Sequence, residues 1–247
     1  MCGRFTLRAS ASVVAEYFAI FEMPPFAPRF NIAPTQPAPV VRLTPATSTH
    51  GQTHGPTHGE THDDSCPTAR EFAWLRWGLI PGWAQDPAVG DRMINARAET
   101  AAQKPAYRAA MRRRRCLVAA DGFYEWQGSG RAKQPYFIHR PDDSLFAFAG
   151  LWEAWEGADH SAVESCTILT TEPNELMRPI HDRMPVILSP GDYQQWLDTD
   201  RSTPEQVAAL LRPCPAEQMR ADPVSTWVNS PTHDDPRCIE PQRSLFA

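Results

Sequence analysis

Residues 116–140 read CLVAADGFYEWQGSGRAKQPYFIHR, and this stretch decides the class of fold. It contains three short runs of apolar, β-branched and aromatic residues, at 116–120, 123–126 and 135–140. The polar, glycine-containing segment 128–133 separates the second run from the third, as the loop of a β-hairpin does. The stretch therefore predicts three consecutive strands, with a hairpin loop between the last two.

The same pattern continues on both sides of this stretch. Further strands are predicted at residues 39–44, 71–77, 145–152, 165–170 and 184–188. Helices are predicted at residues 10–21, 101–114, 190–198 and 204–211, the first behind a serine cap and ended by Pro24 and Pro25. Together these elements predict an α+β fold, a single domain with a strongly bent, mainly antiparallel, barrel-like β-sheet and flanking helices.

Composition narrows the class of protein. The chain has 247 residues, of which 42% are hydrophobic, and this suits one large domain. No run of 18 apolar residues occurs and the N-terminus lacks the apolar stretch of a signal peptide, so we expect a cytoplasmic monomer without membrane association. The net charge of -5 argues against a protein that coats duplex DNA through a basic surface. Any nucleic-acid site should therefore be local.

The six cysteines lie far apart and form no close pairs of the zinc-ribbon kind. We expect reduced thiols and neither a metal site nor a cofactor. Four of the cysteines, Cys116, Cys166, Cys214 and Cys238, fall in or near apolar stretches and are interpreted as packing residues.

Residues 45–70 form a polar, low-complexity stretch that contains the repeat THGQ, THGP, THGE. Histidines four residues apart, as in His50, His54, His58 and His62, could collect a transition metal on one face of a helix. The glycines oppose that helix, so we interpret the segment as a disordered surface insertion with incidental affinity for metals.

Cys2 follows the initiator methionine, and removal of Met1 would make it a 1,2-aminothiol. An α-amine has a reference pKa of about 7.7–8.0, so much of it is neutral and able to attack a carbonyl at cellular pH. The neighbouring thiol could then close a five-membered thiazolidine ring on an aldehyde. The competing interpretation of Cys2 alone is a small, packed apolar residue.

Several further segments carry more polar and aromatic residues than a plain core requires. They are MCGRF (1–5), NIAPTQ (31–36), WGLIPGW (77–83), INARAET (94–100), DGFYEW (121–126) and IHDRMP (180–185). In this order they resemble the SRAP family, the SOS response-associated peptidases or abasic-site processing proteins. The resemblance covers residues 1–241, interrupted by the insertion, and leaves residues 242–247 as a tail.

The resemblance implies a DNA-damage function. Cys2 would form a covalent thiazolidine crosslink, through lyase-like Schiff-base chemistry, with the ring-opened aldehyde of an abasic site in single-stranded DNA, and so shield the site from cleavage. It also implies three further catalytic residues. Glu125 would hold the amine and move its proton, His181 would donate a proton to the sugar ring oxygen, and Asn95 would orient the sugar. A solvent-exposed strand glutamate and a structural histidine are the alternatives for Glu125 and His181.

The resemblance further implies DNA contacts, at Arg4, Pro34, Trp83, Arg97 and Thr170. Arg4 and Arg97 are expected to contact phosphates, and strand alternation should give Asn95 and Arg97 the same face. Trp83 is expected to stack on a base beside the lesion. Some relatives carry a second tryptophan where this chain has Ala84, and an ion pair with Glu99 is the alternative role of Arg97.

The arginine run at residues 112–115 is interpreted as the solvated, basic end of a helix, with DNA contact as the alternative.

Two competing functions remain. The Cys2 thiolate could serve an amidohydrolase or self-processing peptidase, with the α-amine as base. A metal-binding or scaffold protein built on the histidine repeat would leave Glu125 and His181 without a role.

Overall fold

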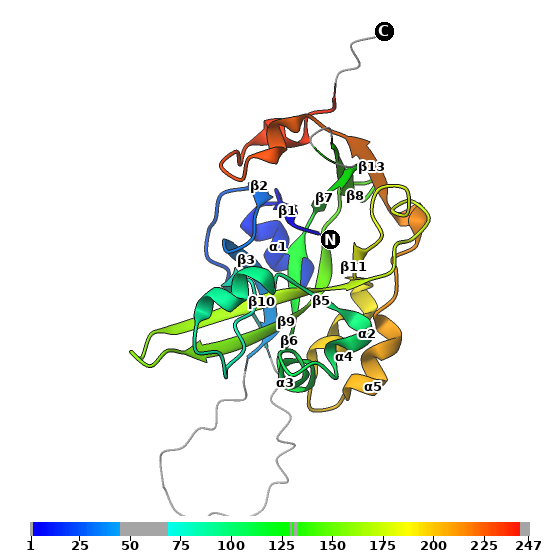
Figure 1. Ribbon diagram of the computed structural model, residues 1–247. Helices are drawn as coiled ribbons and strands as arrows, with labels where there is room; N and C mark the ends of the chain where they lie inside the picture. Colours follow the sequence, from blue (N-terminus) through cyan, green and yellow to red (C-terminus); the bar gives the residue numbers. More distant parts are fainter. Residues whose placement is uncertain (1, 45–68, 129, 131–132, 243–247) are drawn as a thin grey trace, which may run out of the picture.

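Five strands close into a barrel at the centre of the computed structural model, which describes residues 2–44, 69–128, 130 and 133–242 (Figure 1). Around the ring the order is β10, β4, β3, β6 and β9, and β9 pairs again with β10. Their bounds are β3 Pro37–Leu43, β4 Arg70–Trp77, β6 Arg115–Ala120, β9 Phe146–Glu156 and β10 Ala162–Thr171. Only the pairing of β10 with β4 is parallel within this ring. The predicted barrel-like, mainly antiparallel sheet is confirmed.

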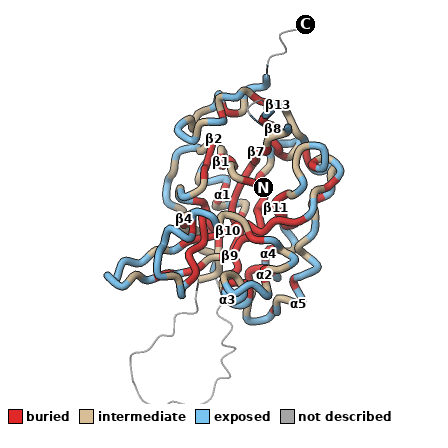
Figure 2. The backbone as a smooth tube through the Cα atoms, in the orientation of Figure 1, coloured by how far each residue is buried: buried red, intermediate tan, exposed pale blue. Residues whose placement is uncertain are grey.

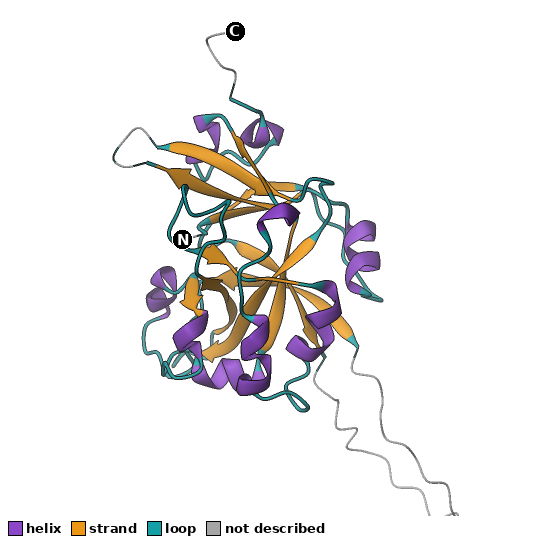
Figure 3. Ribbon diagram, turned by 90° about the vertical axis from the view of Figure 1, so that its right-hand side faces the viewer, coloured by secondary structure: helices purple, strands orange, loops and turns teal. Residues whose placement is uncertain are grey.

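A second sheet of five strands lies against the barrel and carries the N-terminal strand in its interior (Figures 1 and 3). Its order is β13 (Arg220–Pro223), β8 (Gln134–His139), β7 (Gly122–Gln127), β1 (Arg4–Leu7) and β2 (Arg29–Ile32), and every pairing is antiparallel. The predicted hairpin is β7–β8, in which Gln127 pairs with Gln134. Three short strands, β5 (Asn95–Arg97), β11 (Met184–Pro185) and β12 (Ile187–Leu188), extend the barrel sheet.

The core lies inside the barrel and between the two sheets, where Figure 2 shows the strands as the buried part of the chain. All six residues of β6 are buried because both faces of this strand are covered. Phe5 of β1 packs against Trp77 and Phe148 of the barrel, with ring centroids 5.0 and 5.8 Å apart. These aromatic contacts fix β1 to the barrel and so fix the position of the chain that precedes it.

The helices are short and lie on the outside of the strands (Figure 3). They are α1 Ala11–Phe18, α2 Ala98–Ala101, α3 Arg108–Arg113, α4 Tyr193–Leu197 and α5 Pro204–Val207. Helix α1 ends earlier than predicted, because Ala19 adopts a left-handed conformation with φ 54°, and Phe21 beyond it is 95% exposed. No described helix is long and apolar enough to cross a membrane.

The prediction of one helix over residues 101–114 is wrong. The chain forms two separate helices, α2 and α3, with turns between them that contain Pro105. Proline has no backbone N–H, and it disfavours helical geometry in the residue before it, so the apolar periodicity of this region cannot continue as one helix.

The low-complexity insertion lies almost wholly at residues 45–68, outside the described residues. Its flanks are described. Leu43 of β3 pairs with Arg70 of β4, and the N–H of Thr44 donates to the carbonyl of Ala69 over 2.9 Å. The two ends of the insertion are therefore held side by side by an antiparallel strand pair.

Candidate active site

Strand β1 carries Cys2 to the edge of a pocket. Arg4 pairs with Tyr124 of β7, so the residues before β1 run alongside Glu125 and Trp126. At the other end of this pairing Gly122 leaves room for the Phe137 ring of β8, because a Cβ atom there would lie 2.2 Å from that ring. Cys2 is fully buried, at the place where β1 leaves the second sheet.

Asn95 lies beside Cys2 although it is far away in sequence. It begins β5, which runs parallel to β10, and its Nδ2 donates to the carbonyl oxygen of Cys2 over 2.8 Å. Its Oδ1 is buried and accepts no hydrogen bond from any residue that the structure describes. A buried amide oxygen in this state can accept a hydrogen bond from a bound hydroxyl group.

Glu125 is only 2% exposed, although it is a carboxylic acid on a strand. Burial raises the pKa of its carboxyl group, and the positive charge of His181 is among the influences that oppose this rise. The pKa of the Cys2 thiol is also raised, first by burial and then by the negative charge of Glu125. The site therefore favours a protonated thiol beside a carboxyl group that holds its proton more tightly than usual.

His181 lies in the segment between β10 and β11. Its Nδ1 is 3.0 Å from the backbone N–H of Arg183 and 2.8 Å from the carboxylate of Asp182. A neutral imidazole can accept the hydrogen bond from the Arg183 N–H, whereas a protonated imidazole can form an ion pair with the Asp182 carboxylate. The Arg183 side chain anchors this segment, because it donates to both oxygens of Glu99 over 2.8 and 2.9 Å and to the carbonyl of Thr170 over 2.6 Å.

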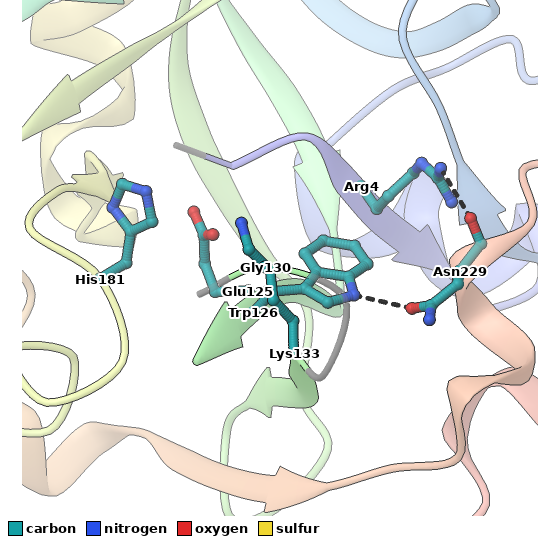
Figure 4. Close-up of a pocket in the computed structure, with 7 residues that line it drawn as sticks. All are labelled: Arg4, Glu125, Trp126, Gly130, Lys133, His181 and Asn229. Carbon is teal, nitrogen blue, oxygen red and sulfur yellow. Dashed lines mark hydrogen bonds between the residues drawn. The ribbon is translucent and has the colours of Figure 1, made fainter. Parts of the chain in front are cut away.

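A cavity of about 450 Å³ opens beside these residues (Figure 4). It is lined by Arg4, Glu125, Trp126, Gly130, Lys133, His181 and Asn229. Figure 4 shows Glu125 and His181 approaching it from separate elements, with the Trp126 ring between Glu125 and Asn229. The structure thus brings four predicted residues together: Cys2 and Asn95 through a hydrogen bond, and Glu125 and His181 around one cavity.

A family model described as "SOS response associated peptidase (SRAP)" matches residues 1–231. The chain belongs to the SRAP family. Its curated relatives include the abasic site processing proteins YoqW and YoaM of Bacillus subtilis, with 39% and 37% identity. These matches cover 97% and 99% of this chain, and 99% and 100% of the relatives. The resemblance predicted from the motifs is therefore confirmed.

Two further matches, to a curated protein and to a solved structure, agree with this assignment. The abasic site processing protein HMCES of Gallus gallus is 37% identical over 68% of this chain and 56% of its own length. A crystal structure of a protein from Bacteroides thetaiotaomicron matches with a TM-score of 0.78 and 25% identity, over 99% of this chain and 100% of that one. The α+β fold is thus shared with a solved structure.

The residues predicted to contact DNA differ in their surroundings. Trp83 is 65% exposed, and Pro34 is partly buried in the turn that follows β2. Arg97 is exposed and, within the described part of the chain, forms no ion pair; the expected alternative partner Glu99 pairs with Arg183 instead. Alternation along β5 buries Ala96 between Asn95 and Arg97.

Thr170, the last of the predicted DNA contacts, lies in the interior of the protein. It is fully buried, its hydroxyl donates to the carbonyl of Ala96 and its own carbonyl accepts from Arg183. In this position Thr170 links β10 to β5, and its contact with DNA stays a prediction.

The interpretation of residues 112–115 as a solvated run is wrong at its end. Arg115 begins β6 and is 2% exposed, and its guanidinium donates to the carbonyls of Met111, Trp196, Asp198 and Ser202. Arg114 pairs with Glu153 over 2.6 Å, and only Arg112 and Arg113 are exposed. The buried guanidinium instead satisfies carbonyl groups around the end of α4.

Within the described residues, no group of three or more His, Cys, Asp or Glu side chains is placed to hold a metal ion.

Sequence reasoning did not identify Lys133, Asn229 or Arg183 as site residues. Arg183 stands inside the IHDRMP motif and could have been noticed there. Lys133 lies in the predicted hairpin loop next to the DGFYEW motif and could also have been noticed there, whereas Asn229 reaches the cavity from a distant part of the chain through bonds to Arg4 and Trp126.

Proposed function

We propose that this protein captures abasic sites in single-stranded DNA through a covalent bond to Cys2. Removal of Met1 makes Cys2 the chain terminus and frees its α-amine. The ring-opened aldehyde of the abasic sugar is the electrophile. The product, a thiazolidine that joins protein and DNA, shields the lesion from strand cleavage.

The reaction has two bond-forming steps. The amine adds to the aldehyde carbon and water leaves, which gives a Schiff base. The thiol sulfur then adds to the imine carbon, and its proton passes to the imine nitrogen, which closes the ring. Glu125 acts as the acid and base for these transfers, and His181 donates the proton that opens the sugar.

The observation that carries this proposal is the hydrogen bond from Asn95 to the carbonyl of Cys2, beside the buried Glu125. The bond holds the cysteine by its backbone and leaves its amine and thiol for chemistry. The free Oδ1 of Asn95 supports a further role, because it can accept a hydrogen bond from a sugar hydroxyl group. Arg97 and Trp83, both exposed, are the proposed contacts to a phosphate and a base.

The raised pKa of the Cys2 thiol argues against the peptidase alternative. An amidohydrolase needs the thiolate as its first nucleophile, and burial next to a carboxylate disfavours that anion. In the crosslinking reaction the amine attacks first, and the thiol can deliver its proton as it closes the ring.

Intact-mass spectrometry with an abasic oligonucleotide tests the proposal. The wild-type protein should gain the mass of the DNA minus water and survive heating, whereas Cys2→Ala should bind the strand but give no stable adduct. Cys2→Ser keeps the amine but lacks the thiol, so it should give an adduct only after borohydride reduction of the Schiff base. A heat-stable adduct of full yield in Cys2→Ala would refute the mechanism.

A further inference from the structure

The cavity beside Glu125 has two permanently cationic side chains in its lining, Arg4 and Lys133. The sequence analysis expects Arg4, like Arg97, to contact a phosphate, and Arg4 lies two residues from Cys2. The two cations have very different surroundings, and this difference indicates which of them is available to a DNA strand.

The guanidinium of Arg4 already has several partners within the protein. Its Nη1 donates to Oδ1 of Asn31 over 3.1 Å and to the carbonyl of Val228 over 2.9 Å, and its Nη2 lies 3.3 Å from the carbonyl of Asn229. The same group lies over the Trp126 ring, 5.9 Å from its centroid. To turn towards a phosphate, Arg4 would have to give up contacts that hold the C-terminal segment against β1.

Lys133 is exposed and forms no ion pair or hydrogen bond with any residue in the described part of the chain. The chain next to it is well anchored, because the following residue, Gln134, opens β8 and pairs with Gln127, and the Gln134 side-chain amide donates to the carbonyl of Val224 over 3.0 Å. Figure 4 shows the Lys133 side chain extending from this hairpin towards the space between Glu125 and Trp126. Lys133 thus directly precedes an anchored strand, and its ammonium group has no partner among the described residues.

We propose that Lys133 binds a backbone phosphate of the DNA strand next to the lesion, in the role that the sequence assigns to Arg4. A lysine ammonium binds phosphate as a compact point charge with three donors. The chain carries a net charge of -5, so the two cations that line this cavity form a local positive site, and of the two only Lys133 lacks a partner among the described residues. This proposal rests on the proposed function for its ligand, a single DNA strand, but not on the covalent step.

The experiment uses an undamaged, fluorescently labelled single-stranded oligonucleotide, so that no crosslink can form. Binding is measured by anisotropy over a series of salt concentrations for wild type, Lys133→Gln and Lys133→Arg. The control is Lys104→Gln, since Lys104 is the only other lysine, is exposed and does not line the cavity. Circular dichroism and melting temperatures establish that each variant is folded.

Lys133→Gln should weaken binding and make the slope of log affinity against log salt shallower by about 0.7, the value for one phosphate contact to a single strand. Lys133→Arg should restore the slope, and Lys104→Gln should match wild type. An unchanged slope in Lys133→Gln would overturn the proposal. In a separate assay with abasic DNA, a Lys133→Gln variant that binds single strands like wild type and alters only the pH dependence of adduct formation would also overturn it, since Lys133 would then act on Glu125. If wild type binds the strand but never crosslinks to abasic DNA, the proposed function fails while the slope still decides the role of Lys133.

Discussion

The side-chain amide of Asn95 donates a hydrogen bond of 2.8 Å to the carbonyl oxygen of Cys2. Asn95→Asp keeps the shape of the side chain but replaces its donor with a second acceptor, so it should lose this bond and repel the carbonyl. A neutral hydrogen bond is worth about 1 kcal/mol, and we expect crosslinking to slow by roughly fivefold or more. Single-turnover adduct formation with saturating abasic DNA measures this. A rate equal to wild type would show that the bond does not position Cys2.

Glu125 should make stability depend on pH. Because burial raises its folded-state pKa above the usual value near 4.5, the folded protein binds more protons than the unfolded chain between these two pKa values. Stability is therefore lost as pH rises through that window. Glu125→Gln cannot ionise, so its melting temperature should exceed that of wild type at neutral pH, and the difference should shrink towards pH 4. A difference that grows as pH falls would contradict the raised pKa.

Substitutions of Arg97 and of Trp83 should weaken DNA binding in ways that can be told apart. Trp83→Ala removes a stacking surface, so it should cost about 1–3 kcal/mol per stacked base without a change in salt dependence. Arg97→Ala removes one phosphate contact and should make the salt slope shallower by about 0.7. Titration of a single strand at several salt concentrations separates the two effects. Identical salt signatures would refute this division of roles.

Arg115→Leu should destabilise the fold, because four backbone carbonyls lose their donor inside the protein. Leaving buried polar groups unpaired costs about 1–3 kcal/mol each before relaxation, so we expect a total loss of roughly 3 kcal/mol or more. Arg113→Ala, which alters an exposed arginine of the same run, is the control and should change stability by less than about 0.5 kcal/mol. Urea unfolding measures both, and equal midpoints would contradict the structural role of Arg115.

Deletion of residues 49–62 should leave folding and crosslinking intact. The pairing of Leu43 with Arg70 already brings the flanks together, so the remaining residues can close the connection between β3 and β4. Melting temperature and adduct yield check this expectation. A deletion variant that fails to fold or to crosslink would show that the histidine repeat belongs to the working domain.

The strands could be predicted from sequence because each has its own local pattern, as in the apolar run of β6 and the turn before β8. Local sequence patterns do not predict the burial of a residue when a segment far away in sequence covers it. Nothing near Arg115 in sequence reveals that α4 covers it, and the burial of Thr170 depends on β5. The core of the candidate site was identified because its residues lie in family motifs, and Lys133 lies in the predicted hairpin loop, whereas Asn229 enters the cavity through contacts that only the folded chain creates.

The bonds from Arg4 to Val228 and Asn229 join parts of the chain 224 and 225 residues apart. Asn229 therefore leaves the ribosome long after Cys2 has emerged, and one wall of the pocket can close only then. During this interval the segment around Cys2 lacks that cover, which gives the proposed removal of Met1 time to occur. The direction of translation thus separates two events in time, the proposed unmasking of the Cys2 amine and the closure of the pocket beside it.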